Sequence, residues 1–267
     1  MNGFQKAIKV FAIFLAMMII LSIIRSVLFG LSIVTNFELE SNSGKEFSET
    51  YQDVEKIDIE ISSAHITIKT GAEFKVVATN IKNDFSSKLN KRTLKISDNQ
   101  KWFNNKNNTK IILYVPDGKI LEDFKINSGA GKVEIVNVVA NNFNINQGAG
   151  LMKISYSKFN NINIEGGVGA TEIISSILNN LNLETGVGSV DIEAEITGNS
   201  KIDCGVGKVN LLLHGNQDLY TISAKKGLGT IRINNEKQTI KNKAYVGGDN
   251  IIKINGGLGD INVNFTN

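Results

Sequence analysis

Carboxylates recur at one position of a repeating unit in the middle of this 267-residue chain. Glu165, Glu184 and Asp203 follow one another at a constant interval, and each lies two residues before a glycine. Glu172 and Asp191 form a neighbouring column with the same spacing. Like charges stacked at strand spacing repel, so such a ladder destabilises the fold, raises a carboxyl pKa, or holds a cation or a basic partner. The simplest alternative is a solvated surface whose repulsion is absorbed by water and salt.

Glycine-rich bends followed by lysine, at Gly131-Lys132 and Gly207-Lys208, are compatible with phosphate binding, because backbone amides and a lysine can surround an anion. Each lysine is followed by valine rather than Ser or Thr, and the pattern predicts that a strand, not a helix, comes next. These features exclude a P-loop and a dinucleotide-binding fingerprint.

A calcium site is the second candidate, because residues 256–263 nearly match the nonapeptide of calcium-binding β-rolls. In that pattern the aspartate comes two residues after the last glycine, whereas Asp260 comes one residue after Gly259, and the other copies carry no repeated carboxylate there. Calcium needs several oxygen ligands. We predict no metal site and no other cofactor.

Catalysis also lacks a plausible set of residues. Paired acids serve glycosidases and β-helical polysaccharide lyases, but those enzymes set them in a groove with aromatic or basic sugar contacts, and the single tryptophan lies outside the regular repeat. His65 and His214 have no defensible nucleophile beside them, and Cys204 is the only cysteine. We predict that the protein is not an enzyme and has no catalytic residues.

The element that positions all these residues is a repeated bend of glycine, apolar residue, glycine. Its first five copies recur with a constant 19-residue period, which predicts stacked strand-bend-strand units. Apolar positions alternate with polar ones on both sides of the bend, as in a strand with one buried face. We expect the residue between the glycines to point inward as well. The seven bends are Gly129-Ala130-Gly131, Gly148-Ala149-Gly150, Gly167-Val168-Gly169, Gly186-Val187-Gly188, Gly205-Val206-Gly207, Gly227-Leu228-Gly229 and Gly257-Leu258-Gly259.

Asparagine pairs at 141–142, 160–161 and 179–180, and Gly198-Asn199, are expected to close the coils, because Asn and Gly tolerate a left-handed backbone. The predicted fold class is all-β, a single parallel β-solenoid with 19-residue coils. One N-terminal transmembrane helix is expected to precede it.

That helix is predicted from the apolar segment 10–34, which follows Lys6 and Lys9 and is interrupted by Arg25. A cleaved signal peptide would begin in the same way, but no small-x-small site follows Ile24 directly. We therefore expect an uncleaved signal anchor at 10–34, a cytoplasmic segment 1–9, a linker 35–44, and an extracytoplasmic domain in a single-pass protein of the cell membrane.

The rest of the chain divides at about residue 118. Strands are predicted at 54–61, 64–70, 74–79, 92–97 and 110–115, and we interpret 45–118 as irregular opening coils that cap the first edge of the regular glycine-bend solenoid, 119–267. Residues 62–68 resemble a degenerate copy of the bend.

Several segments together resemble a known family. They are Lys69-Thr70-Gly71, Leu94-Lys95-Ile96, the segment 112–118 and the Gly-x-Gly-x-Val/Ile-x-Ile copies. This ordered combination, over residues 45–267, is similar to a bacterial domain-of-unknown-function family described as "putative adhesins", which includes membrane-anchored proteins associated with cell-envelope stress systems. The resemblance implies a β-solenoid, commonly behind one transmembrane helix, without established catalytic residues.

Charge excludes one class of partner. The net charge is +3, and residues 1–35 contain three bases and no acid, so the remainder carries 26 bases and 26 acids. A nucleic-acid binder would carry excess positive charge on its folded domain, so we predict no nucleic-acid partner. Within the repeats, residues 165–203 are mainly acidic and residues 225–243 mainly basic.

We therefore predict a membrane-anchored, adhesin-like binding or scaffold module of the bacterial cell envelope, whose partner is an envelope protein or a surface ligand. Two alternatives remain: an accessory subunit of an envelope-stress sensor, and a structural protein that assembles end to end. The second rests on residues 260–267, which we interpret as an uncovered edge strand at the C-terminal end, capable of self-association.

Overall fold

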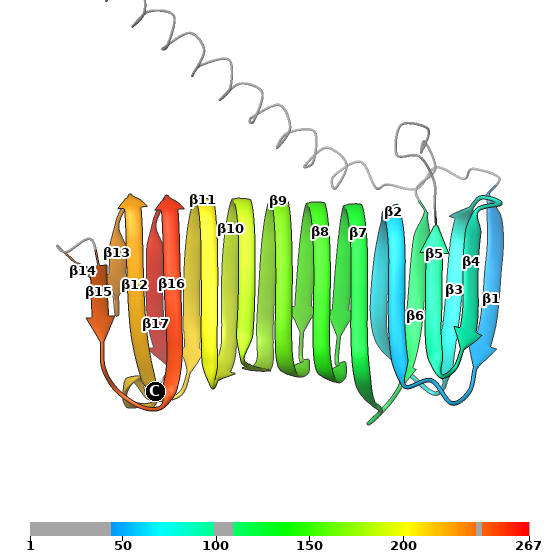
Figure 1. Cartoon of the computed structure of the whole chain (residues 1–267), viewed down its shortest axis with the longest axis horizontal. Helices are drawn as coiled ribbons and strands as arrows, with labels where there is room; N and C mark the ends of the chain where they lie inside the picture. Colours follow the sequence, from blue (N-terminus) through cyan, green and yellow to red (C-terminus); the bar gives the residue numbers. More distant parts are fainter. Residues whose placement is uncertain (1–43, 99–108, 239–241, 267) are drawn as a thin grey trace, which may run out of the picture.

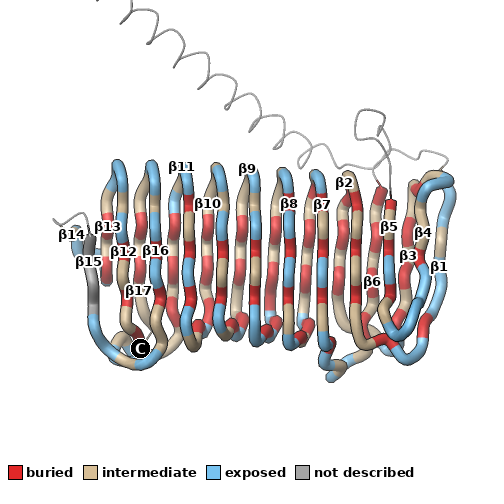
Figure 2. The backbone as a smooth tube through the Cα atoms, in the orientation of Figure 1, coloured by how far each residue is buried: buried red, intermediate tan, exposed pale blue. Residues whose placement is uncertain are grey.

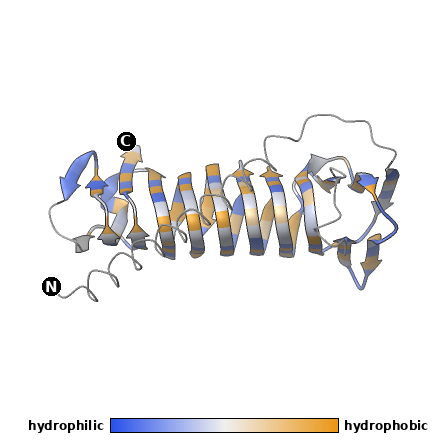
Figure 3. Cartoon of the chain, turned by 90° about the horizontal axis from the view of Figure 1, so that it is seen from above, coloured by the Kyte–Doolittle hydropathy of each residue, from blue (hydrophilic) through white to orange (hydrophobic). Residues whose placement is uncertain are grey.

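The computed structural model describes residues 44–98, 109–238 and 242–266, with side chains omitted at 242–245. These residues form one continuous sheet of 17 strands that winds into a stack of coils, and η2 (Gln217–Leu219) is a single 3₁₀ turn. Viewed from above, the coils follow one another in a single row (Figure 3). The chain is thus all-β and β-solenoid-like, as the periodic bends predict.

The middle of the stack consists of five bent strands, and consecutive members of this set pair in parallel with each other. Leu183, for example, lies beside Ile164 on one side and Ile202 on the other, so the period of the sequence is also the spatial register. The five strands are β7 (Ile120–Val136), β8 (Val139–Ser155), β9 (Lys158–Asn179), β10 (Leu181–Thr197) and β11 (Asn199–His214) (Figure 1).

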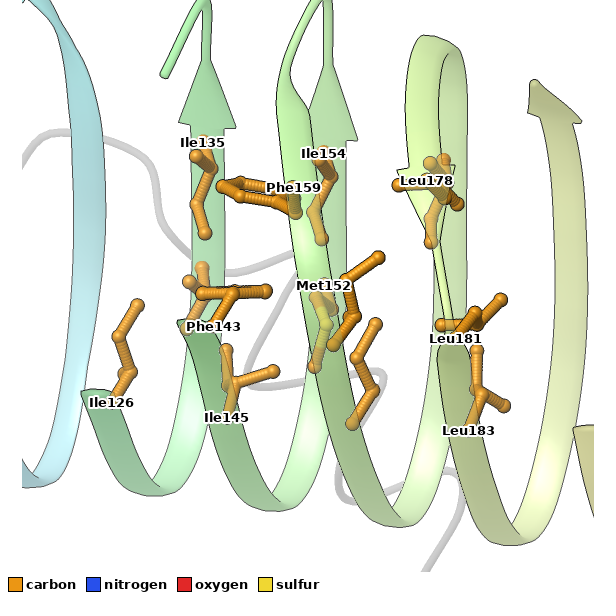
Figure 4. Close-up of a cluster of buried hydrophobic side chains, with 14 of the residues drawn as sticks. Ile126, Ile135, Phe143, Ile145, Met152, Ile154, Phe159, Leu178, Leu181 and Leu183 are labelled. Carbon is orange, nitrogen blue, oxygen red and sulfur yellow. The ribbon is translucent and has the colours of Figure 1, made fainter. Parts of the chain in front are cut away.

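Buried side chains fill the inside of the coils in columns that alternate with exposed positions (Figure 2). Phe124 and Phe143 lie side by side in one column, and the ring of Phe159, from the column of Ala140, stacks on that of Phe143 with centroids 4.4 Å apart. Isoleucines and leucines from both halves of each coil complete this core (Figure 4). Burying such aromatic and branched residues is the main favourable contribution to the stability of the stack.

The glycine bends are needed for two reasons, a left-handed backbone and the close approach of neighbouring coils. Gly188 has a φ of 152°, and a side chain there would overlap the carbonyl oxygen of Gly169 in the coil before it. The prediction that the residue between the glycines points inward is wrong, because Val206, Leu258 and Leu228 are 42%, 49% and 72% exposed. At a convex corner two consecutive residues face outward, which shifts the alternation by one position.

The opposite side of the coils carries asparagine ladders, but the prediction that the asparagine pairs supply a left-handed backbone there holds only in part, because 141–142 and 160–161 lie within strands and the left-handed residues of those coils are Asn137 and Tyr156. Asn142 donates to Asp123, Asn161 to Asn142 and Asn180 to Asn161, at 2.9, 3.1 and 3.4 Å. Asn180 has a φ of 55° and Gly198 a φ of 71°, so both supply a left-handed residue at the corner.

At the first end of the stack, β2 (Lys56–Gly71) is a complete coil whose register with β7 places Ala64 beside Gly131, so residues 62–68 do form the degenerate bend. The next layer outward combines β5 (Thr93–Asp98) and β6 (Lys110–Pro116), both parallel to β2. Antiparallel strands then cover the edge, a feature not predicted: β1 (Lys45–Tyr51), β3 (Phe74–Ile81) and β4 (Phe85–Asn90).

At the other end the chain does not continue in order. The coil of β12 (Tyr220–Leu228) and β13 (Ile231–Ile233) lies outermost, and the final coil of β16 (Asn250–Leu258) and β17 (Ile261–Thr266) lies between it and β11. The interpretation of residues 260–267 as an uncovered edge is therefore wrong for the first half of β17, because residues 261–263 pair with β11 on one side and with β13 on the other. Short antiparallel strands cover β12 and β13 instead, namely β15 (Asn242–Tyr245) and β14 (Glu236–Gln238).

No helix in the described ranges is long and apolar enough to span a bilayer. The anchor predicted at 10–34 lies outside the described residues.

Candidate binding groove

An open groove of about 900 Å³ runs across the coils on one side of the bends. It extends from β2 to β11, and its floor is the backbone next to the bend glycines. Among the described residues, the lining contains no lysine or arginine and five carboxylates, Glu60, Asp98, Glu165, Glu184 and Asp203. We call it the acidic groove.

The predicted ladder is the wall of this groove. Strand register places Glu165, Glu184 and Asp203 side by side on β9, β10 and β11, so the structure brings all three together. The repulsion expected between them is reduced by neighbours on the same face: Lys201 contacts Glu184 at 3.5 Å and Asp203 at 2.5 Å. Hydrogen bonding and Coulomb attraction from Asp203, with a smaller contribution from Glu184, raise the pKa of Lys201.

Amide groups satisfy further carboxylate oxygens of the ladder. Asn163 donates to Glu165 at 3.1 Å, and Asn255 of the inserted coil donates to Asp203 at 2.6 Å. Glu184 keeps about half of its side chain exposed, at 51%, whereas Asp203 is 30% exposed. A ligand with positive charge would therefore meet carboxylates that are held in place but are not enclosed.

The second predicted column, which contains Glu172 and Asp191, lies after the bend and outside the acidic groove. Its carboxylates have partners of their own, because Lys153 contacts Glu172 at 3.1 Å and Asn210 donates to Asp191 at 2.5 Å. Further along, Glu134 binds Lys132. The two columns that look alike in sequence thus differ in position: one lines the groove, and the other lies outside it.

Beneath the groove lies a column of small and polar side chains. Gln147 is buried and donates to the carbonyl oxygen of Gly131 at 3.0 Å, which fills the inside of one bend. Ser128 is buried, and its Oγ has no hydrogen-bond partner among the described residues. Cys204 is 3% exposed, and burial raises the pKa of its thiol, which makes it less reactive.

The remaining residues considered for chemistry have structural contacts. Asp260 accepts a hydrogen bond from the backbone N–H of Thr230 at 2.7 Å and lies 3.7 Å from Arg232, so it ties the inserted coil to the outer one. His65 contacts Glu134 at 3.0 Å, and His214 lies 3.5 Å from Glu193. Among the described residues no group of three His, Cys, Asp or Glu side chains is arranged to hold a metal ion.

Two carboxylates of the groove were missed by the search for a regular period. Glu60 and Asp98 belong to the irregular first end, and Asp98 is almost fully buried, at 1% exposure. A signal for Glu60 was present, because the degenerate bend at 62–68 aligns it with Asn127, the equivalent of Glu165 in the regular coils.

A family model described as Toastrack DUF4097 matches residues 54–264, the same range that the stacked coils occupy. The chain belongs to the Toastrack family. This confirms the family resemblance, and it accounts for a repeat that continues from the irregular first end through the inserted final coil. No curated protein matches this Toastrack chain.

Solved structures similar to this Toastrack protein include a "putative cell adhesion protein" from Clostridium sporogenes, with 17% identity, a TM-score of 0.41, and coverage of 83% of this chain and 99% of that one. Another is a "putative lipid binding protein" from Parabacteroides distasonis, with 14% identity, a TM-score of 0.45, and coverage of 84% and 98%. A third is a "putative adhesin" from Parabacteroides merdae, with 11% identity, a TM-score of 0.36, and coverage of 86% and 99%. At this identity a function does not transfer.

Proposed function

We propose that this Toastrack protein is an adhesin-like, non-catalytic binding module of the bacterial cell envelope. Residues 10–34 would anchor it in the membrane, and the coils of residues 44–267 would lie outside the cytoplasm. The acidic groove would receive an extended partner that carries positive charge, such as a basic peptide segment of an envelope protein.

One observation supports the binding role most strongly: carboxylates on successive coils form the wall of an open groove whose described lining residues include no lysine or arginine. An open groove that crosses several coils suits an extended partner better than a small molecule, which needs a more enclosed site. Attraction between such a groove and a basic segment also increases the association rate at low salt.

The test is a titration of the full chain in detergent micelles with a fluorescent oligolysine peptide, followed by anisotropy. We expect the combined substitution Glu165→Gln, Glu184→Gln and Asp203→Asn to weaken binding at least about tenfold at low salt, since each exposed pair contributes up to about 1 kcal/mol.

The matched control is the combined substitution Glu172→Gln and Asp191→Asn, which removes two carboxylates from the same coils but outside the groove. We expect it to change the affinity less than about twofold, since these carboxylates do not line the groove. Equal affinity of the groove variant and the unmodified chain would refute the proposed role of the groove.

End-to-end assembly loses the observation that favoured it, because the last copy of the repeat is internal and both ends of the stack carry antiparallel strands. Self-association and an accessory role in envelope-stress sensing stay predictions. Light scattering of the full chain over a range of concentrations tests the former.

A further inference from the structure

The apex residues of the glycine bends form an apolar ridge along one edge of the stack. Register places them next to one another in the spatial order Ala130, Ala149, Val168, Val187, Val206, Leu258, Leu228. Side-chain size therefore increases steadily toward the end formed by β12 and β16. There the three most exposed apex residues, Val206, Leu258 and Leu228, are 42%, 49% and 72% exposed.

Exposed lysines accompany the large apex residues. Lys208 follows the bend of Val206, Lys225 precedes the bend of Leu228, and Lys253 lies on the coil between them. All three are exposed, and none makes an ion pair with another described residue.

The nearby acids are already occupied. Asp203 is bound by Lys201 and Asn255, and Asp260 by Thr230 and Arg232. This end of the ridge thus combines protruding apolar side chains with unneutralised positive charge, which is the combination that binds an anionic lipid surface.

The opposite edge of the stack provides a contrast. It also exposes apolar side chains, including Tyr156 at 65% and Leu219 at 51%. The charged neighbours of Leu219 are acidic, however, with Asp218 beside it and Asp249 on the adjoining loop, which Gly248 brings against Leu219. An anionic surface would be repelled near Leu219, so charge distinguishes this part of the edge from the ridge, whereas near Tyr156 the exposed Lys158 is basic.

The entry point of the chain lies on the same edge as the ridge. Lys45 pairs with Ile81 at the start of β1. The pairing of β3 with β6 and of β6 with β2 places Lys45 at about the same height along the coils as the degenerate bend at 62–68 (Figure 1). Forty-three residues precede Gly44, and the linker predicted at 35–44 can span at most about 36 Å. A membrane anchor in the preceding segment would therefore hold the bend edge, rather than the opposite edge, toward the bilayer.

We propose that the ridge end formed by Val206, Leu258 and Leu228, with Lys208, Lys225 and Lys253, docks on the anionic surface of a lipid bilayer. This inference rests on the anchor in the proposed function. The anchor would act near β1 and the ridge at the far end, so the coils would have two points of attachment, and the second would gain from the high effective concentration that the first creates. The acidic groove would then open sideways along the membrane surface.

The test uses the full chain with an environment-sensitive fluorophore at position 228, in the variant Leu228→Cys. The matched control carries it at position 156, in Tyr156→Cys, which is similarly exposed but lies on the opposite edge. Cys204 stays in place because it is buried, and the labelled unmodified chain gives the background. Both proteins are mixed with vesicles of phosphatidylcholine alone or with added phosphatidylglycerol, which contain spin-labelled lipids as quenchers.

We expect strong quenching and a blue shift at position 228 in the anionic vesicles and little change at position 156. Replacing Lys208, Lys225 and Lys253 by Gln should weaken the docking about fivefold per lysine. Equal quenching at both positions, or no quenching at position 228, would overturn the inference. A blue shift at position 228 that appears at high protein concentration without lipid would overturn it as well, because it would indicate self-association through the ridge. Flotation with neutral vesicles reports the anchor separately, so a failure of the anchor and a failure of the ridge give different results.

Discussion

The middle and the two ends of this stack use the same coil but connect it differently. Between β7 and β11 each coil lies beside the next one in the chain, in the register of the repeat. At the ends the partner is far in sequence: Glu60 of β2 lies beside Asn127, and Asp203 of β11 lies beside Asn255. At the first end, β2 is the first coil of the chain, and β5 and β6 cover it. At the other end, β16 and β17 form the last coil of the chain, and β12 and β13 cover it. The comparison shows that a repeat fixes the shape of a coil but not its place in the stack.

The largest effect should come from removing the inserted coil by truncating the chain after residue 245. Because β16 and β17 separate β11 from β12 and β13, their loss leaves strands on both sides without a partner. We expect a loss of more than about 4 kcal/mol in the free energy of unfolding, or failure to fold, measured by urea denaturation.

The matched control deletes one middle coil, residues 149–167, which joins Gly148 to Val168 in the register of the repeat. It should stay folded with a smaller loss, because each coil contacts only its neighbours and the new neighbours are equivalent. If the chain truncated after residue 245 loses no more stability than the variant that lacks residues 149–167, the inserted position of the last coil would be contradicted.

A bend glycine in the middle should be the next most sensitive site. Gly188→Ala places a methyl group against the carbonyl oxygen of Gly169 and in a left-handed backbone, so we expect a loss above about 4 kcal/mol. Gly118→Ala shares the positive φ but has nothing within 4 Å of the new side chain, and should lose only about 1–2 kcal/mol. Thermal unfolding followed by circular dichroism measures both. Similar losses would mean that backbone conformation, not the close approach of coils, accounts for the glycines.

Much of the middle could be predicted from the sequence because its determinants are local. The constant period gives the register directly, and the alternation around Ile145, Ile164 and Leu183 gives the buried face. The same information placed Glu165, Glu184 and Asp203 side by side. It could not predict Lys201 between the carboxylates, because side-chain contacts across coils depend on rotamers as well as on register.

The ends and the bend apex could not be predicted in the same way. The apolar residue Val206 suggested an inward position, but a corner turns two consecutive residues outward, and period-two alternation does not apply across it. The order of β12 and β16 depends on which copy pairs with β11, and both copies carry compatible apolar columns. Nonlocal pairing of two similar segments leaves no periodic signal in the chain.

Aromatic packing offers a smaller contrast between the middle and the first end. Phe143→Ala removes a fully buried ring that contacts the rings of Phe124 and Phe159. We expect it to lower the free energy of unfolding by about 3–5 kcal/mol. Phe85, in the covering strand β4, is only partly buried and meets Phe47 edge to face at 5.2 Å. Phe85→Ala should therefore lose about 1–2 kcal/mol in urea denaturation. A larger loss of stability for Phe85→Ala than for Phe143→Ala would show that the covering strands, and not the buried phenylalanines of the middle, limit the stability of the stack.

The smallest predicted effect concerns the junction between the first end and the middle, where Glu134 of β7 meets His65 of β2 at 3.0 Å. Burial would raise the pKa of Glu134, but hydrogen bonds from Lys132 and His65 outweigh it and hold the pKa below its ordinary value of 4.5. A lowered carboxyl pKa stabilises the fold above the unfolded value and loses that contribution as the pH falls through the folded value. Glu134→Gln should thus be less stable than the unmodified chain at pH 7, by under about 1 kcal/mol, with the difference disappearing below about pH 4. Urea denaturation of both proteins across this range measures it, and a difference independent of pH would assign the role of Glu134 to packing. If the difference does follow the pH, this nonlocal junction depends on a charge in the same column in which Lys153 of β8 contacts Glu172 of β9 at 3.1 Å.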